Sequence, residues 1–267
     1  MANQIGRRDF LKLGFAGLAT AAVGIGASRF NLPVAATPPK KTTAADGKHQ
    51  WAMVIDESKC VGCDGCLRAC HAYNDTPPEI AWSRVENAGV KEDGTPAYRP
   101  VPCMHCQDAP CVEICPVGAS YRRDDGIIMM DYERCIGCRY CQLACPYGAR
   151  SFNWETFEEP NPAVPTYGQP EVPRRPRGVV EKCSFCYHRI DRGLAFGMIP
   201  GVDPAATPAC VVACSYGARI FGDLNDPESP VSVALRDNPE AYRLREELGT
   251  EPRVYYIPAK PGEEEPS

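Results

Sequence analysis

Sixteen cysteines, gathered into four groups of four, constrain this sequence more than any other feature. The first and third groups read C-x2-C-x2-C-x3-C, and the second reads C-x2-C-x4-C-x3-C. In the fourth group, 23 residues separate the second and third cysteines. No cysteine lies outside a group. The groups are Cys60, Cys63, Cys66 and Cys70; Cys103, Cys106, Cys111 and Cys115; Cys135, Cys138, Cys141 and Cys145; and Cys183, Cys186, Cys210 and Cys214.

Three chemistries compete to explain thiols grouped in this way: a disulfide framework, structural zinc and iron–sulfur clusters. Disulfides are the default for an exported cysteine-rich chain, but the thiols of one dense C-x2-C-x2-C loop point at a common centre. Zinc fits paired C-x2-C motifs and leaves the remaining cysteines of each run unexplained. The bacterial ferredoxin run explains them all, because three thiolates of one loop bind one cluster and the fourth binds another.

The ferredoxin run carries a proline after its last cysteine, and Pro116 and Pro146 stand at that position. Sixteen thiolates, at four per cluster, predict four 4Fe–4S clusters with no ligand missing. We therefore expect no cluster with an open iron, and hence an electron carrier that is not itself an enzyme. The four histidines suggest no catalytic site, because His49 and His188 have no suggestive sequence neighbours. His105, inside a cysteine loop, is expected to pack or hydrogen-bond there.

The N-terminal segment has the anatomy of an export signal. Arg7 and Arg8 precede Asp-Phe-Leu-Lys, a mildly apolar stretch follows at 13–27, and a small-residue cleavage site could lie at 34–36. This pattern predicts a twin-arginine signal peptide at 1–36, the alternatives being a Sec signal or a retained membrane anchor. The twin-arginine route exports folded, cofactor-loaded proteins, which explains why a thiol-rich chain would enter an oxidising compartment. We therefore expect a periplasmic protein, associated with the membrane through partner subunits.

The rest of the chain argues against two other classes of protein. No stretch of about 20 apolar residues follows residue 30, so we expect no transmembrane helix there. Without residues 1–36, the chain holds 25 Lys and Arg against 33 Asp and Glu. This net charge of −8 argues against nucleic-acid binding.

Self-similar segments predict a duplicated unit. "AMVIDESKCVGC" parallels "IIMMDYERCIGC", and strands are expected to lead into these loops at 54–56 and 127–131. The second and third groups are close in sequence and form an inner unit at 100–153. The first and fourth groups must then pair around it, as an outer unit of 51–85 plus 178–225. The predicted fold class is α+β and loop-rich, with two interleaved 2×(4Fe–4S) ferredoxin-like units in a pseudo-two-fold relation.

Two further segments lie outside these units. Residues 154–177 hold many prolines and predict an extended arm without regular secondary structure. Its Arg174, Arg175 and Arg177 could face an acidic partner or be solvated, and we favour the latter. Residues 226–267 form a C-terminal tail, for which we predict a helix at 238–248 and a role in wrapping a partner or the body of the fold.

The sequence resembles a known family, the four-cluster ferredoxin subunit of DMSO-reductase-type respiratory complexes. The likeness covers nearly all of 50–258 and is carried by "CIGCRYCQLACPYGARSF", "VVEKCSFC", "PACVVACSYGARIFGDLNDPES" and "LGTEPRVYYIP". The arm before "VVEKC" and the "ACHAYN" segment are most similar to the DsrO branch, which belongs to a sulfite-reductase-linked Dsr membrane complex. The NrfC-like subunits of nitrite reductase systems come next.

The resemblance implies an electron relay between an integral membrane, quinone-binding NrfD-type subunit and a periplasmic partner, either a multihaem cytochrome c or a molybdopterin enzyme. His71 and Ser215 depart from the family pattern of proline after the last cysteine, so we expect altered potentials or solvent access in the outer unit. The implied ligand sets are Cys60, Cys63, Cys66 and Cys214; Cys70, Cys183, Cys186 and Cys210; Cys103, Cys106, Cys111 and Cys145; and Cys115, Cys135, Cys138 and Cys141.

Overall fold

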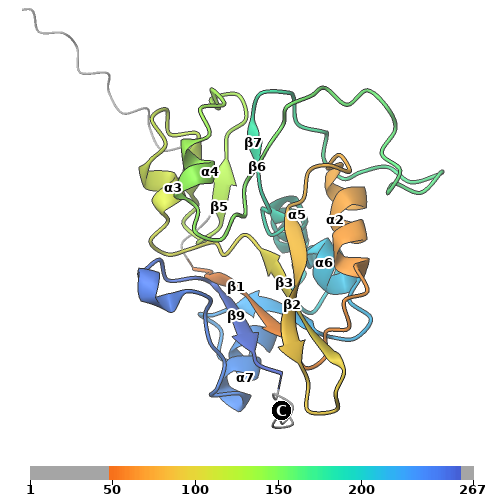
Figure 1. The fold of residues 1–267 in the computed structure, drawn as a ribbon, viewed down its shortest axis with the longest axis vertical. Coiled ribbons are helices and arrows are strands. Elements are labelled where there is room, and N and C mark those ends of the chain that lie inside the picture. Colours follow the sequence, from red (N-terminus) through yellow and green to blue (C-terminus); the bar gives the residue numbers. More distant parts are fainter. Residues whose placement is uncertain (1–47, 260–267) are drawn as a thin grey trace, which may run out of the picture. The chain divides into compact units, whose positions relative to one another are not determined.

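The computed structural model describes residues 48–259, so the predicted signal peptide at 1–36 and the end of the tail at 260–267 lie outside the described residues. Short helices and small sheets alternate along a loop-rich chain (Figure 1). In chain order, the elements are β1 (Trp51–Asp56), α2 (Gly65–Asn74), β2 (Ser83–Val90), β3 (Pro96–Pro102), α3 (Pro110–Glu113), β4 (Ser120–Arg122), β5 (Ile128–Met130), α4 (Tyr140–Ala144), β6 (Ser151–Phe152), β7 (Val180–Glu181), α5 (Tyr187–Ala195), the 3₁₀ turn η1 (Pro204–Ala206), α6 (Ala209–Val212), β8 (Arg219–Asp223), α7 (Pro230–Asp237), the 3₁₀ turn η2 (Glu246–Leu248) and β9 (Val254–Ile257).

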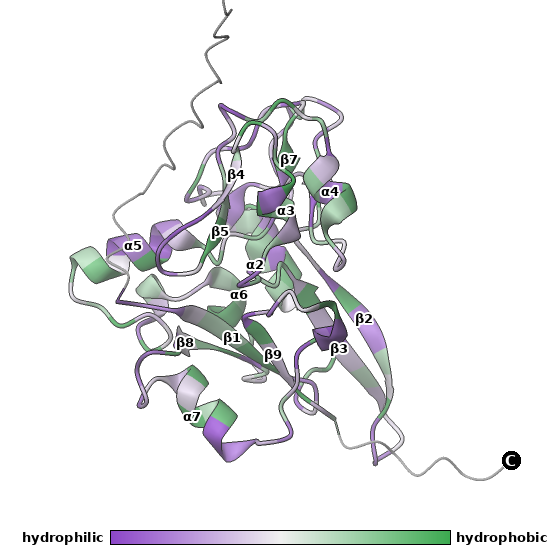
Figure 2. Cartoon of the chain, turned by 90° about the vertical axis from the view of Figure 1, so that its left-hand side faces the viewer, coloured by the Kyte–Doolittle hydropathy of each residue, from purple (hydrophilic) through white to green (hydrophobic). Residues whose placement is uncertain are grey.

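A three-stranded sheet in the order β8-β1-β9 joins the two ends of the described chain. β1 pairs antiparallel with β8 and parallel with β9. Alternate residues of a strand point to opposite faces, and here both faces are covered: Met53 and Ile55 enter the main core, and Ala52 and Val54 pack in a smaller cluster that includes Val231 of α7. Figure 2 shows α7 on the side of this sheet away from α5 and α6.

The remaining strands form two-stranded pairs: β2 with β3, β4 with β5, and β6 with β7. β1 and β5 fall where the sequence predicts strands leading into cysteine loops. Within residues 48–259, no helix is both long and apolar enough to cross a membrane.

The helix predicted at 238–248 is wrong. The tail's helix is α7, which begins with Pro230 at its first turn and Ser229 as its N-cap, the Ser229 Oγ accepting from the Ser232 N–H at 3.5 Å. It ends at Asp237 because Asn238 precedes Pro239, and a residue before proline disfavours the helical conformation. The predicted segment contains only the single turn η2.

The arm at 154–177 contains no helix or strand, as its prolines predict. The interpretation of its arginines as solvated is wrong for two of the three. Arg174 donates to Asp75 at 2.9 Å, and Arg175, 7% exposed, donates to the buried Glu181 at 2.9 Å. Only Arg177 is exposed, and it donates to the Trp154 carbonyl at 2.9 Å. The arm is therefore bound to the body of the fold by charged contacts.

Candidate metal centres

All sixteen cysteines are free thiols in the structure. Seven are buried, seven are partly buried, and only Cys63 and Cys138 are exposed. Within residues 48–259, no three His, Cys, Asp or Glu side chains are placed to hold a single metal ion.

The first group meets the last cysteine of the fourth group. Burial raises the pKa of Cys60, and the nearby thiols of Cys66 and Cys214 raise it further. The Gly62 N–H opposes this rise by donating to Cys60. Gly62 has a φ of 69°, and a Cβ there would lie 2.9 Å from the ring of Tyr98, so the turn of this loop requires glycine.

The last cysteine of the first group lies among the other three cysteines of the fourth group. Burial raises the pKa of Cys70 well above its usual value, and charges on three neighbours contribute: Cys183, Cys186 and Cys210. Burial, together with the charges of neighbouring thiols, also raises the pKa of Cys210 to about 12. Asn74 Nδ2 faces this set and lies 3.8 Å from Cys70 Sγ and 3.6 Å from Cys186 Sγ.

The second and third groups repeat this exchange. Burial raises the pKa of Cys106 to about 12, and charges on three neighbours contribute: Cys103, Cys111 and Cys145. The last cysteine of the second group joins the third group, because the residues that line one small pocket include Cys115, Cys135, Cys138 and Cys141. The Ser120 N–H donates to Cys115 Sγ at 3.4 Å. The four sets that the resemblance implies remain a prediction, with which these neighbours are compatible.

Close thiols also link one set to the next. Cys66 of the first set contributes to the pKa of Cys210 in the second, and Cys103 of the third contributes to that of Cys183 in the second. Burial raises the pKa of Cys141 in the fourth set, Arg150 opposes this rise, and Cys111 of the third set adds to it. Thiols of each predicted set therefore lie near thiols of the next.

Three buried cations beside these thiols were missed by the sequence analysis. Arg150 and Arg219 each stand five residues after the last cysteine of a group, in "CPYGAR" and "CSYGAR". The shared Tyr-Gly-Ala-Arg was a usable signal for both. Lys182 directly precedes Cys183 and is 1% exposed. Nothing local signals its burial, because Lys59 precedes Cys60 in the same way and is exposed.

Three of the histidines make packing or polar contacts within the fold. His105 accepts a hydrogen bond from the Ile128 N–H at 3.0 Å and stacks on Phe185, as expected for a histidine that packs inside its loop. Burial lowers its pKa well below the usual value. His49 and His188 have partners that the sequence does not reveal: Asp223 at 2.7 Å and Glu171 at 3.0 Å.

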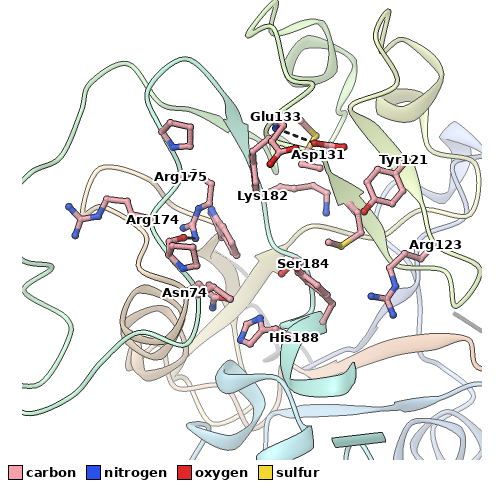
Figure 3. Close-up of a pocket in the computed structure, with 18 residues that line it drawn as sticks. Asn74, Tyr121, Arg123, Asp131, Glu133, Arg174, Arg175, Lys182, Ser184 and His188 are labelled. Carbon is pink, nitrogen blue, oxygen red and sulfur yellow. Dashed lines mark hydrogen bonds between the residues drawn. The ribbon is translucent and has the colours of Figure 1, made fainter. Parts of the chain in front are cut away.

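A cavity of about 480 Å³ lies between the arm and β5, and none of its lining residues is a cysteine (Figure 3). Its walls include Asn74, Tyr132, Arg175 and His188, with Lys182 and Ser184 from the segment around Cys183. Figure 3 shows Lys182 beside this cavity, with its amine directed toward β5. The Lys182 Nζ donates to the carbonyls of Ile128 and Cys183.

Comparisons with known proteins agree with this reading of the thiols. Residues 59–119 and 95–160 each match a family described as "4Fe-4S dicluster domain". The chain is 42% identical over 229 residues to "Menaquinone reductase, iron-sulfur cluster-binding subunit" of Nitratidesulfovibrio vulgaris, covering 79% of this chain and 89% of that protein. It is 38% identical to "Arsenate respiratory reductase iron-sulfur subunit ArrB" of a Shewanella species, covering 77% and 94%. It is 35% identical to "Protein NrfC homolog" of Haemophilus influenzae, covering 84% and 86%.

Proposed function

The chain belongs to the iron–sulfur subunit family of molybdopterin oxidoreductases, and on that premise we propose that its cysteine sets form a four-step electron relay. As an electron-transfer subunit of this family, it binds four 4Fe–4S clusters. The clusters supply one-electron chemistry, and the protein sets their potentials through burial, charge and hydrogen bonds to sulfur. The observation that carries the proposal is that thiols of each predicted set lie near thiols of the next.

We assign the four ligand sets as the resemblance implies, and number the centres from one to four along the series. Support comes from the buried thiols that raise one another's pKa within each set and from the small pocket whose lining includes all four thiols of the fourth. The sets are centre one, Cys60, Cys63, Cys66 and Cys214; centre two, Cys70, Cys183, Cys186 and Cys210; centre three, Cys103, Cys106, Cys111 and Cys145; and centre four, Cys115, Cys135, Cys138 and Cys141.

Exposure of the thiols supports electron exchange with partners at the two ends of the series. The two exposed cysteines, Cys63 and Cys138, belong to centres one and four, whereas centres two and three contain none. Apolar side chains are exposed beside each end: Val61 near Cys63, and Ile136 and Tyr140 near Cys138. Such surfaces suit a partner that covers the end centre on docking.

The two units are proposed to interleave, with a pseudo-two-fold relation between them. In the outer unit (51–85 plus 178–225), β1 pairs with β8 and α2 contacts α6, which joins its two halves. In the inner unit (100–153), β4 pairs with β5 and α3 contacts α4. The arm at 154–177 and the tail at 226–267 complete this division of the chain.

For the complex, we propose a membrane NrfD-type quinone-binding subunit at one end and a periplasmic redox protein at the other, in a Dsr-type assembly. The "ACHAYN" and "VVEKC" segments support this choice, and the predicted signal peptide at 1–36 supports periplasmic export by the twin-arginine route. An NrfC-like or molybdopterin-enzyme complex is the second candidate, supported by the relatives. Purification of the native complex under anaerobic conditions tests these choices through the subunits that accompany the chain.

The ligand sets are tested by counting iron in single and double cysteine variants. The wild-type chain, purified without oxygen, should hold sixteen irons and show visible absorption and EPR signals of 4Fe–4S clusters. Cys183→Ser should lose one centre, and Cys183→Ser with Cys210→Ser should lose no more, because both thiols serve centre two. Cys183→Ser with Cys111→Ser should lose two centres. A wild-type chain with far fewer irons contradicts the relay itself, and additive losses within centre two contradict the assigned sets.

A further inference from the structure

Three buried cations, which we name the gap cations, have no carboxylate partner. Arg219, Lys182 and Arg150 are 4%, 1% and 3% exposed. None of the three takes part in a salt bridge within residues 48–259. Because a buried charge without a counter-charge is strongly unfavourable, anions of another kind must face these side chains.

Arg219 faces thiols of centres one and two. Its Nη1 lies 3.7 Å from Cys210 Sγ, a ligand of centre two, and its side chain also donates to Cys66, a ligand of centre one. Nη1 further contacts the sulfur of Met53 at 3.5 Å, and Nη2 donates to Ser83 Oγ at 3.3 Å. Its Nε has no partner among the described residues.

Arg150 has a matching environment between centres three and four. Its Nη2 donates to Cys111 Sγ, a ligand of centre three, at 3.0 Å, and its side chain also donates to Cys141 of centre four. As at Arg219, the remaining contacts are a methionine sulfur, Met130 at 3.0 Å, and a serine hydroxyl, Ser120 at 2.7 Å. The two arginines therefore occupy the same place in the two units.

Lys182 lies where the units meet. Burial lowers the pKa of its amine, and the charges of Cys103, a ligand of centre three, and Cys183, a ligand of centre two, oppose this fall. Its hydrogen bonds reach across the same boundary, because it donates to the Cys183 carbonyl at 2.7 Å and to the Ile128 carbonyl in β5 of the inner unit. Lys182 thus lies at the boundary between the two units, where it bonds backbone carbonyls and not ligand sulfurs.

We propose that one buried cation occupies each of the three gaps between successive centres and sets the potentials of the two centres that flank it. Arg219 serves the first gap, Lys182 the second and Arg150 the third. This inference rests on the proposed relay and its ligand sets. A positive charge in a dry gap favours the added electron on either side, so it holds the two potentials high together. A cation shared in this way assists transfer without trapping the electron on one centre.

Replacing one gap cation at a time tests the proposal by EPR-monitored redox titration of the anaerobic full chain. Arg219→Gln and Arg150→Gln remove the charge but keep a polar side chain. Each should lower the ratio of reduced to oxidised form of two centres at a fixed potential at least tenfold, a shift of 59 mV for a one-electron couple. The two centres whose potentials fall in Arg219→Gln should differ from the two whose potentials fall in Arg150→Gln. Lys182→Gln should lower the potential of one centre from each pair.

Matched variants separate charge from other effects. Arg219→Lys and Arg150→Lys keep the charge and should keep wild-type potentials and iron content, even where a glutamine variant fails to load its clusters. Lys59→Gln alters the lysine that precedes Cys60 in the outer repeat, but Lys59 is 54% exposed and should leave all four potentials unchanged.

Potentials that stay at wild-type values in fully loaded glutamine variants would overturn the proposal, and so would lysine variants that keep their iron but shift as the glutamine variants do. The proposal would also be overturned if both arginine replacements shifted the potentials of the same two centres. Failure of the relay itself is recognised separately, because it appears in the iron content and EPR signals of the unaltered chain.

Discussion

The proposed outer and inner units each contain two cysteine groups, but different contacts support them. The inner unit is continuous, and the tail holds it mainly through backbone and hydroxyl hydrogen bonds, such as those from the Asp108 N–H to the Thr250 carbonyl at 3.0 Å and from the Arg253 N–H to the Met104 carbonyl at 2.9 Å. The outer unit is split along the chain, and the arm holds it through the ion pairs Arg174–Asp75 and Arg175–Glu181. The cysteine pattern is therefore repeated in the sequence, whereas the contacts that support each copy are not.

The largest effect is expected from Glu181→Gln, because Glu181 joins the arm to both units. The carboxylate is fully buried and accepts from Arg175 at 2.9 Å, Trp82 at 3.0 Å and Asn153. Removing its charge leaves the buried Arg175 without a counter-charge, at a cost of about 3–5 kcal/mol. The melting temperature of the loaded protein should fall on the order of 10 °C. Glu86→Gln is the control, since its pair with Arg84 is well exposed and contributes at most about 1 kcal/mol. Equal shifts in the two variants would refute this role.

A smaller effect is expected from Asn74→Ala, which removes an amide that faces the sulfurs of one centre only. In the outer unit, this amide lies within hydrogen-bonding distance of the sulfurs of Cys70 and Cys186, whereas in the inner unit the backbone N–H of Ser120 donates to Cys115. Losing the amide should lower the potential of centre two by on the order of 50 mV and leave the inner pair unchanged. Redox titration of the variant checks this result. A shift in centre three or four would show that the amide acts through the fold.

The smallest effect is expected from Tyr147→Phe in the inner unit. The buried Tyr147 hydroxyl bonds Thr250 Oγ1 at 2.5 Å and donates to the Leu244 carbonyl at 3.2 Å, so it ties the third cysteine group to the tail. The loss should be about 1 kcal/mol, and the melting temperature should fall by about 2–4 °C. Iron content should remain that of the wild type. A fall as large as that in Glu181→Gln would mean that the tail supports the inner unit as strongly as the arm supports the outer one.

The sequence predicted the centres better than their surroundings. Ligand spacing is a local property, so the cysteine runs and the strands before Cys60 and Cys135 could be read directly. The ion pair of Arg174 could not be predicted, because its partner Asp75 lies far away along the chain. The positions of Lys59 and Lys182 before a cysteine are alike, and only the packing of the inner unit against Lys182 separates their burial. Residues between the centres therefore depend on tertiary contacts that no local pattern encodes.

The place of β1 in its sheet has a consequence for the order of events during synthesis. β1 leaves the ribosome early, but both of its neighbours, β8 and β9, are translated near the end. Until then, its backbone donors and acceptors are without the strands that satisfy them. The inner thiols, in contrast, are all present once Cys145 has emerged. A nascent chain stopped before Cys210 holds a complete inner set and an incomplete outer one, so the inner pair of centres can be filled first, and the central sheet closes last.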